Sequence, residues 1–152
     1  MSGYLLDTNV VSELRKRRPD PNVQAFAATL DAEETYLSVV TIAEIAAGAH
    51  KLRARDEARG EALITWLNSL VNAYGRRVLP LDDLMAATAG ILQAVGGPRP
   101  INDTYILATA MTEELTLVTR NTKDFTLADD VREYMRKGWP DGVTVINPWE
   151  DR

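Results

Sequence analysis

The sequence predicts an α/β fold, a parallel five-stranded sheet between two layers of helices in an α/β/α sandwich. Two observations predict it. Short runs of β-branched and aromatic residues alternate with longer segments of helical periodicity, which is typical of parallel strands joined by crossover helices. In addition, the 152 residues have the length of one ordinary domain and contain no internal repeat, low-complexity tract or linker. We therefore expect residues 1–152 to form a single domain.

The first half of the chain contains two predicted strands and four predicted helices. The strands are a short apolar run and a segment rich in β-branched and aromatic residues, at 3–6 and 35–40. Helical periodicity is found in four segments, at 9–16, 22–30, 41–55 and 56–74. Asp7 or Thr8 is expected to cap the first helix, and Pro19 and Pro21 separate it from the second.

The second half is expected to contribute three strands and two helices. The strands are predicted at 77–81, 115–119 and 143–147. A helix over 82–95 stops at Gly96-Gly97-Pro98, and another over 102–114 is expected to be capped by Asn102 or Asp103. After the last strand, Pro148 ends the pairing and Trp149 covers the sheet edge, without a role in chemistry.

The composition excludes several classes of protein. With 45% hydrophobic and 26% charged residues, the chain has the composition of a soluble globular protein. Its longest apolar stretch, 42–49, is interrupted by Glu44 and is too short to span a bilayer. The first residues do not resemble a signal peptide. The absence of cysteine excludes disulfides and thiolate metal sites, so we expect a cytoplasmic protein.

The single histidine and the net charge restrict the chemistry further. His50 alone cannot form a catalytic histidine pair or a zinc site with several imidazoles, and a surface position explains it adequately. The net charge of −5 argues against sequence-independent binding of nucleic acid. It does not exclude a nuclease whose metal ions offset a cluster of carboxylates.

Acidic residues follow the predicted strands. Asp7 comes directly after the first strand, Glu44 lies one turn into the helix after the second, and Asp103 opens the helix before the fourth; Asn121 and Asp124 follow that strand. Because the carboxyl ends of parallel strands meet at one edge, these groups are expected to gather there. Each also has an ordinary explanation, as a helix cap, a solvent-facing residue or a turn residue.

Carboxylates gathered at one edge repel one another, and their pKa values rise unless a cation neutralises them. Oxygen ligands of this kind suit Mg²⁺ or Mn²⁺, which keep several waters. Such a site is suited to phosphoryl chemistry, in which a metal-activated water attacks and no histidine is needed.

Five segments carry a resemblance to a known family. They are, in order along the chain, LLDTNVVSEL, LSVVTIAEIAAG, INDTYILATA, LVTRNTKDF and VINPW. These segments resemble the blocks of PIN-domain ribonucleases, and within them the VapC/FitB-type toxins of bacterial toxin–antitoxin pairs. The resemblance spans almost the whole chain and implies a PIN fold and a Mg²⁺- or Mn²⁺-dependent endoribonuclease. It also implies a homodimer that a small cognate antitoxin silences in a higher assembly, with operator DNA bound only through the antitoxin.

The resemblance assigns roles to individual residues. Asp7, Glu44 and Asp103 take the places of the family's three main acidic residues, as catalytic residues and metal ligands. Thr8 and Asn9 complete the first block, and Asn9 is expected to form a hydrogen bond within the acidic edge. Thr119 and Asn121 are supporting residues of the fourth block.

One position departs from the family pattern. Several relatives carry an acid where this chain has Asn121, and Asp124 follows three residues later. Either Asp124 supplies the fourth catalytic and metal-binding carboxylate or the second metal position is weak. We favour Asp124.

Two basic clusters are candidates for contact with RNA or with the antitoxin, although surface charge explains them as well. The first comprises Arg15, Lys16, Arg17 and Arg18, and the second comprises Lys51, Arg53, Arg55 and Arg59.

Other classes of protein fit less well. A phosphatase of the haloacid-dehalogenase type needs an Asp two residues after Asp7, where this chain has Asn9, and a receiver domain needs a Lys where it has Arg120. The alternative that stays open is a catalytically weak PIN-fold binding module, which acts with an antitoxin in operator DNA binding and autoregulation.

Overall fold

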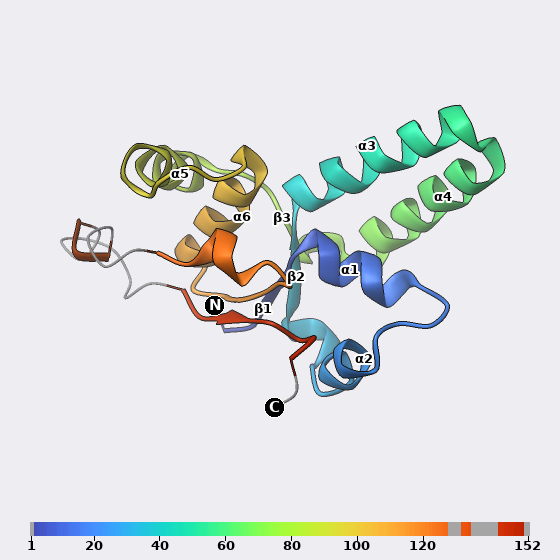
Figure 1. Ribbon diagram of the computed structural model, residues 1–152, viewed down its shortest axis with the longest axis horizontal. Coiled ribbons are helices and arrows are strands. Elements are labelled where there is room, and N and C mark those ends of the chain that lie inside the picture. The colour runs from blue at the N-terminus through green and yellow to red at the C-terminus, as the bar shows by residue number, and fades with distance from the viewer. Residues whose placement is uncertain (1, 128–131, 135–142, 151–152) are drawn as a thin grey trace.

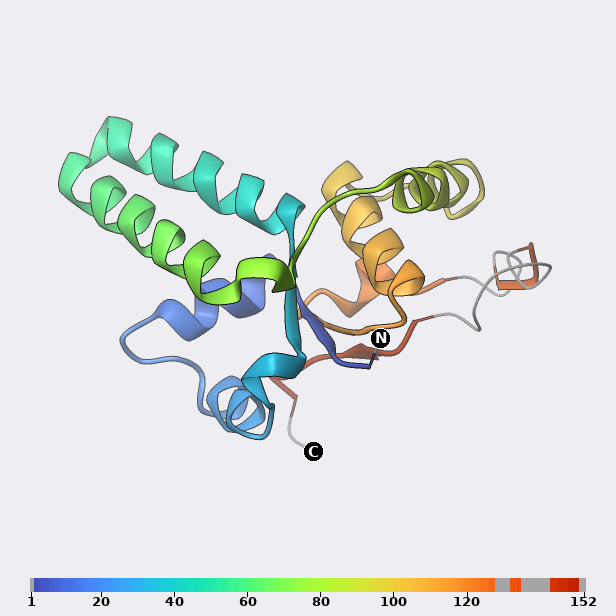
Figure 2. The same ribbon diagram turned by 180° about the vertical axis from the view of Figure 1, so that it is seen from behind.

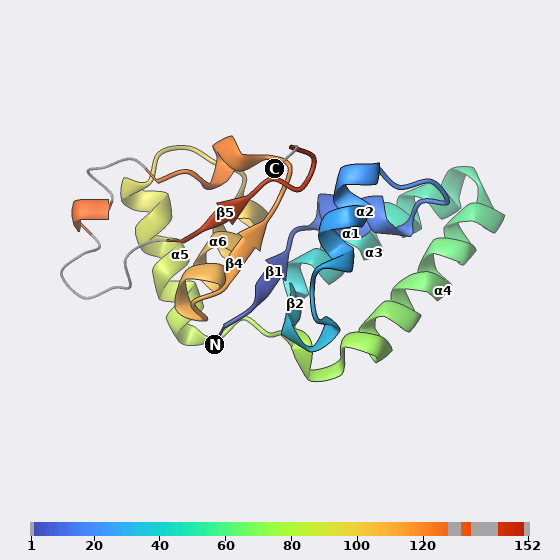
Figure 3. The ribbon, with the colours of Figure 1, turned by 90° about the horizontal axis from the view of Figure 1, so that it is seen from below.

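Five parallel strands form the sheet of the computed structural model, which describes residues 2–127, 132–134 and 143–150. In chain order they are β1 (Tyr4–Leu6), β2 (Thr35–Ser38), β3 (Val78–Leu79), β4 (Thr116–Val118) and β5 (Val145–Ile146). Their spatial order is β3-β2-β1-β4-β5, so the first strand is central, and Figure 3 shows β2, β1, β4 and β5 side by side. The predicted parallel five-stranded sheet is confirmed.

Helices cover both faces of this sheet (Figure 1). The α-helices whose bounds lie within the described residues are α1 (Thr8–Arg15), α2 (Pro21–Ala28), α3 (Val39–Arg55), α4 (Glu57–Tyr74), α5 (Asp83–Val95) and α6 (Ile101–Thr112). Short 3-10 helices are η1 (Ala32–Glu34), η2 (Gly75–Arg77) and η3 (Thr122–Phe125). Figures 1 and 2 show α5 and α6 on one side of the sheet and α1 to α4 on the other. In the described part of the chain, no helix is long and apolar enough to cross a membrane.

The two layers have separate apolar cores, because successive side chains of a strand point to opposite faces. Leu5 and Leu117 belong to the core beneath α5 and α6, which also contains Leu92 and Leu107. The neighbouring Leu6 and Val118 belong to the core beneath α1 to α4. The alternation accounts for the absence of polar residues within β1, which has apolar neighbours on both sides.

Two predicted strands are longer than the observed ones. The segment predicted at 35–40 leaves the sheet after Ser38, because the Ser38 side chain accepts a hydrogen bond from the Val40 N–H and starts α3. The segment predicted at 77–81 forms only Val78–Leu79, and Pro80, which has no N–H to donate, follows. Both strands therefore end at the same edge as β1.

Helix starts differ from the predictions by one or two residues. Asp7 caps α1 as expected, whereas α2 begins at Pro21, one residue early, with Asp20 as its cap. The prediction that Asn102 or Asp103 caps the helix before β4 was wrong. Pro100 is the N-cap of α6, and its carbonyl oxygen accepts from the Thr104 N–H at 3.1 Å. Asp103 therefore lies within the first turn, with its side chain free of a capping role.

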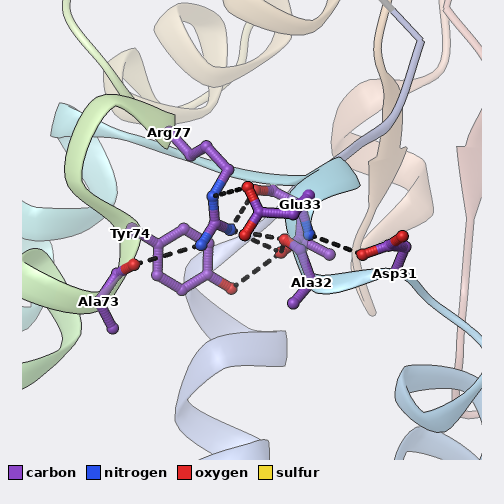
Figure 4. A network of polar contacts seen from close by, with 7 residues as sticks. Asp31, Ala32, Glu33, Ala73, Tyr74 and Arg77 are labelled. Atoms are coloured by element: carbon purple, nitrogen blue, oxygen red, sulfur yellow. Dashed lines mark hydrogen bonds and ion pairs between the residues drawn. The ribbon is translucent and has the colours of Figure 1, made fainter.

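Arg77 joins the amino end of β2 to the end of α4 (Figure 4). Its Nη1 donates to the carbonyl oxygens of Ala32 at 2.6 Å and Thr35 at 2.9 Å, and its Nη2 donates to Ala73 O at 3.2 Å. The guanidinium also lies 4.6 Å from the centre of the Tyr74 ring. This contact holds the sheet at the edge opposite the acidic residues.

The last described residues follow β5. Pro148 is buried, and Trp149 packs against the core beneath α1 to α4. The Arg120 guanidinium lies 5.3 Å from the centre of the Trp149 ring. Trp149 therefore packs on the face of the sheet that α1 to α4 cover, and the expectation that it covers the sheet edge stays a prediction.

Candidate active site at the carboxyl edge of the sheet

Asp7 is the most constrained carboxylate at this edge. It is 5% exposed, and its N–H donates to Val118 O at 2.9 Å, which continues the pairing of β1 with β4. Its Oδ1 accepts from the Thr8 N–H at 2.8 Å, and its Oδ2 accepts from Thr119 Oγ1 at 2.7 Å. Burial raises the pKa of Asp7 above its usual value against these hydrogen bonds, and the negative charges of Glu44 and Asp124 add to the rise.

Asn9 and Thr119 connect the end of β1 to the end of β4. Asn9 Nδ2 donates to Asp7 Oδ2 at 3.2 Å, and Asn9 Oδ1 accepts from the Arg120 N–H, also at 3.2 Å. Thr119 is fully buried, and its hydroxyl oxygen accepts from the Asn121 N–H at 3.1 Å. The expected hydrogen bond of Asn9 within the acidic edge is therefore present.

Glu44 reaches the same edge from α3. Thr8 Oγ1 lies 2.8 Å from Glu44 Oε1 and 3.1 Å from Thr41 Oγ1, and Thr41 is buried. Because a hydroxyl has one proton, we assign Thr8 as the donor to the carboxylate and Thr41 as the donor to Thr8. Glu44 is thus oriented by Thr8, the residue next to Asp7. The sequence alone was equally compatible with a solvent-facing Glu44.

Asp103 lies in the first turn of α6 and is partly buried. Burial raises its pKa from 3.8 to about 6, and the negative charges of Asp7, Asp124 and Glu44 contribute to this rise, while Arg99 opposes it. The carboxylates that follow β1 and that belong to α3, α6 and η3 therefore act on one another at a single edge of the sheet.

Asn121 and Asp124 take different positions after β4. Asp124 belongs to η3, where its N–H donates to Asn121 O at 3.0 Å, and its charge raises the pKa of both Asp7 and Asp103. Asn121 is exposed, and its backbone N–H supports Thr119. Of the two, Asp124 contributes the negative charge to this edge.

The donor set suits a hydrated oxygen-loving cation. In the ranges that the structure describes, no three acidic or histidine side chains stand close enough to enclose one ion together. Mg²⁺ usually takes one or two protein carboxylates and keeps several waters or substrate oxygens, so it does not require such a cage. The mutual repulsion that raises the pKa of Asp103 is the kind that a divalent cation relieves.

The basic candidates of the first cluster lie beyond this edge, on α1 and the turn after it. The Arg15 guanidinium lies 5.5 Å from the centre of the Trp66 ring, and Lys16 forms an ion pair with Glu13. Arg17 and Arg18 are exposed. In the second cluster, Arg53 forms an ion pair with Glu61 at 2.8 Å, and Lys51, Arg55 and Arg59 are exposed.

Arg99 was missed by sequence reasoning. It precedes α6 in a segment rich in Gly and Pro, where a charged residue is ordinarily exposed. Its Nε and Nη1 atoms are buried, and neither has a hydrogen-bond partner among the described residues. Burial lowers the pKa of its guanidinium, against the charges of Asp103 and Asp124. The only sequence signal was its position four residues before Asp103.

A parallel α/β/α sheet with carboxylates gathered at the carboxyl ends of its strands agrees with the PIN fold that the sequence predicts. The PIN domain family matches residues 4–131, and the chain belongs to this family. It is 32% identical to toxin FitB of Neisseria gonorrhoeae over 97% of this chain and 99% of that protein. It is 34% identical to a VapC ribonuclease of Sinorhizobium fredii over 96% of this chain and 97% of that protein.

Solved structures show the same similarity. The crystal structure of FitAcB from Neisseria gonorrhoeae gives a TM-score of 0.78 at 33% identity and covers 97% of this chain and 99% of that chain. A structure of FitAB bound to a DNA fragment gives 0.71 at 31% identity and covers 98% of this chain and 97% of that chain. The PIN fold expected from the sequence is confirmed.

Proposed function

We propose that this protein is a metal-dependent endoribonuclease and the toxin of a toxin–antitoxin pair. The observation that carries the proposal is the convergence of Asp7, Glu44, Asp103 and Asp124 at one edge of a PIN fold. It is supported by the relatives, because a protein of similar length and 34% identity is named a VapC ribonuclease. The reaction is hydrolysis of an RNA phosphodiester bond.

Asp7 and Asp103 would hold Mg²⁺ or Mn²⁺, with Glu44 and Asp124 completing the acidic edge directly or through water. The ion supplies activation of a water nucleophile and stabilisation of charge on the leaving oxygen. Thr119 and Asn9 fix the direction of the Asp7 carboxylate. Hydrogen bonds of this kind preserve the geometry of a ligand, and weakening them lowers metal affinity or activity.

Asp124 is proposed as the fourth carboxylate. Its charge already acts on Asp7 and Asp103, whereas the exposed Asn121 supports Thr119 through its backbone. With Asp124 in this role, the edge has four carboxylates although Asn121 is uncharged.

The same relatives suggest partners. Solved structures of FitAcB and of FitAB bound to DNA are similar to this chain over nearly its whole length. We infer that a small cognate antitoxin binds this protein, that the protein forms a homodimer within that assembly, and that operator DNA is bound only through the antitoxin. We propose that the protein acts in the cytoplasm, where it would meet its RNA substrate.

A catalytically weak binding module is the second candidate. The feature that favours it is Asn121, since an uncharged residue replaces the acid of several relatives. The module would still dimerise and bind the antitoxin, but RNA would be cut slowly or not at all.

Incubation of the purified, antitoxin-free protein with total cellular RNA separates the two candidates. With Mg²⁺ or Mn²⁺ we expect discrete cleavage products, and none with EDTA. Equal cutting in EDTA would contradict metal dependence. No cutting by a folded protein with either metal would contradict the ribonuclease assignment and favour the binding module.

A further inference from the structure

Arg99 lies between α5 and α6, beside the acidic edge. Its Nη2 donates to the carbonyl oxygen of Gly96 at 3.2 Å, which ties the side chain to the end of α5. Nε and Nη1 have almost no accessible surface and no hydrogen-bond partner in the parts of the chain that the structure describes, so a ligand reaches them only when the side chain turns outward. These two atoms carry three of the five N–H donors of a guanidinium.

Unsatisfied buried donors lower stability, and a guanidinium cannot avoid this by losing its proton. Natural proteins pair such groups, so an exception requires a reason. If the only role of Arg99 were to pair with Asp103 and Asp124, we would expect its Nε and Nη1 donors to form hydrogen bonds with these carboxylates. Here Asp103 and Asp124 act on Arg99 through their charge, and none of their oxygens accepts from Nε or Nη1.

The free donors indicate the chemistry of the missing partner. The partner must be an acceptor with several oxygens, because three N–H groups need partners. It must also tolerate the negative charges of Asp103 and Asp124, which a nearby divalent cation and the Arg99 charge would offset. A phosphate of a nucleic-acid backbone meets both conditions, and guanidinium groups bind phosphate oxygens directly.

We propose that the Arg99 side chain, which is partly exposed as a whole, turns outward and binds a backbone phosphate of the RNA at the acidic edge. This inference rests on the proposed ribonuclease function and adds a substrate-binding residue inside the site. Arg99 differs from the basic residues of 15–18 and 51–59, whose side chains are exposed or contact other side chains of the same chain. Arg99 instead has unused donors and a charge that acts directly on Asp103 and Asp124.

A purely internal role for Arg99 makes a different prediction. If Arg99 only offsets the carboxylates, its removal increases the negative potential, so that Mn²⁺ binds more tightly, and Arg99→Lys, which keeps the charge, binds RNA like the wild type. If the guanidinium binds phosphate, Arg99→Lys recovers only part of the RNA affinity, because an ammonium cannot reproduce the guanidinium contacts. The two roles therefore separate when the RNA affinities of Arg99→Gln and Arg99→Lys are compared.

The test uses Arg99→Gln and Arg99→Lys, with Arg76→Gln as a control that carries the same charge change. Arg76 is exposed and belongs to η2, which precedes β3. Binding of a fluorescent 2′-O-methyl oligoribonucleotide, which resists hydrolysis, is measured by anisotropy in Mn²⁺. Mn²⁺ affinity is measured by calorimetry without RNA, and thermal unfolding confirms that each variant is folded. Cleavage of unmodified RNA gives kcat and KM.

We expect Arg99→Gln to weaken oligoribonucleotide binding by about tenfold to a hundredfold, the loss typical of a charge-assisted hydrogen bond. Arg99→Lys should recover part of this loss, and Arg76→Gln should bind like the wild type. Equal binding by wild type and Arg99→Gln, including the case in which neither binds, would overturn the inference. The binding assay does not depend on cleavage. A wild type that binds RNA without cutting it would therefore contradict the proposed function, while the comparison of Arg99 variants would still test the inference.

Discussion

Thr119 Oγ1 lies 2.7 Å from Asp7 Oδ2, so that the residue after β4 holds the carboxylate that follows β1. The two residues are 112 positions apart in sequence, and the pairing of Leu6 with Val118 brings them together. The register of the central strands is therefore what sets the direction of the Asp7 carboxylate.

Thr119→Val should test this hydrogen bond, because valine has nearly the same shape and no hydroxyl. We expect a decrease of about tenfold in kcat/KM for RNA, which corresponds to a net loss of about 1–1.5 kcal/mol. Thr65→Val on the exposed side of α4 is the matched control and should cleave like the wild type. A fully active Thr119→Val variant would show that Asp7 needs no support from β4.

The raised pKa of Asp103 predicts a pH-dependent stability in the metal-free protein. Its folded pKa is about 6 against a usual 3.8, so the folded state binds this proton more tightly than the unfolded state. The resulting stabilisation is fully present below about pH 3.8 and is lost as the pH rises through 6.

Asp103→Asn removes this dependence, so the difference in Tm between the variant and the wild type isolates it. In EDTA the variant should gain a few degrees relative to the wild type between pH 4.5 and 7.5, about 1 kcal/mol after allowance for solvent screening. Mn²⁺ should reverse the difference at pH 7.5, since only the wild type keeps the carboxylate. A pH-independent difference in Tm would contradict the raised pKa.

Arg77 offers a test of the opposite edge of the sheet. Arg77→Lys keeps the charge but cannot reproduce the simultaneous hydrogen bonds to Ala32, Thr35 and Ala73. We expect a loss of about 1–3 kcal/mol in the free energy of unfolding, with kcat/KM unchanged for the folded protein. Arg76→Lys is the control. Equal urea midpoints for the two variants would show that the Arg77 contacts add little.

Two glycines of the α3–α4 hairpin should respond in opposite directions to alanine. A Cβ at Gly60 would lie 2.3 Å from Arg53 Cα, a backbone atom that cannot move independently of α3. Gly60→Ala should therefore cost about 1–3 kcal/mol by overpacking. A Cβ at Gly48 meets nothing within 4 Å, so Gly48→Ala should gain about 0.5–1 kcal/mol from helix propensity. Urea unfolding measures both, and a stabilised Gly60→Ala would contradict the close approach of the two helices.

The fold was predictable because its elements have local signals. The apolar run before Asp7 and the β-branched segment before α3 identify buried strands, and helical periodicity between them requires crossover connections. The ends were less predictable. Val39 and Val40 favour a strand, but the Ser38 cap places them in α3. Similarly, Asn102 and Asp103 are good caps by type, yet α6 begins after Pro100.

The acidic residues of the candidate site could be predicted from the sequence, but its arginine, Arg99, could not. Asp7, Glu44 and Asp103 each follow a strand or open a helix, so topology alone brings them to one edge. Arg99 has no periodic pattern and stands among Gly and Pro. The role proposed for it rests on the burial of Nε and Nη1, which depends on tertiary packing and leaves no local signal in the sequence.

The most direct test of a shared carboxylate site compares Asp7→Asn with Asp83→Asn in RNA cleavage over a range of Mn²⁺ concentrations. Asp83 is exposed in the first turn of α5, so both variants lose one negative charge and only Asp7→Asn changes the acidic edge. We expect Asp83→Asn to cleave at the wild-type rate and Asp7→Asn to lose at least about a hundredfold, because losing a ligand should cost more than the roughly tenfold to hundredfold of losing a residue that only orients one. Wild-type cleavage by Asp7→Asn would contradict the assignment of this edge as the active site.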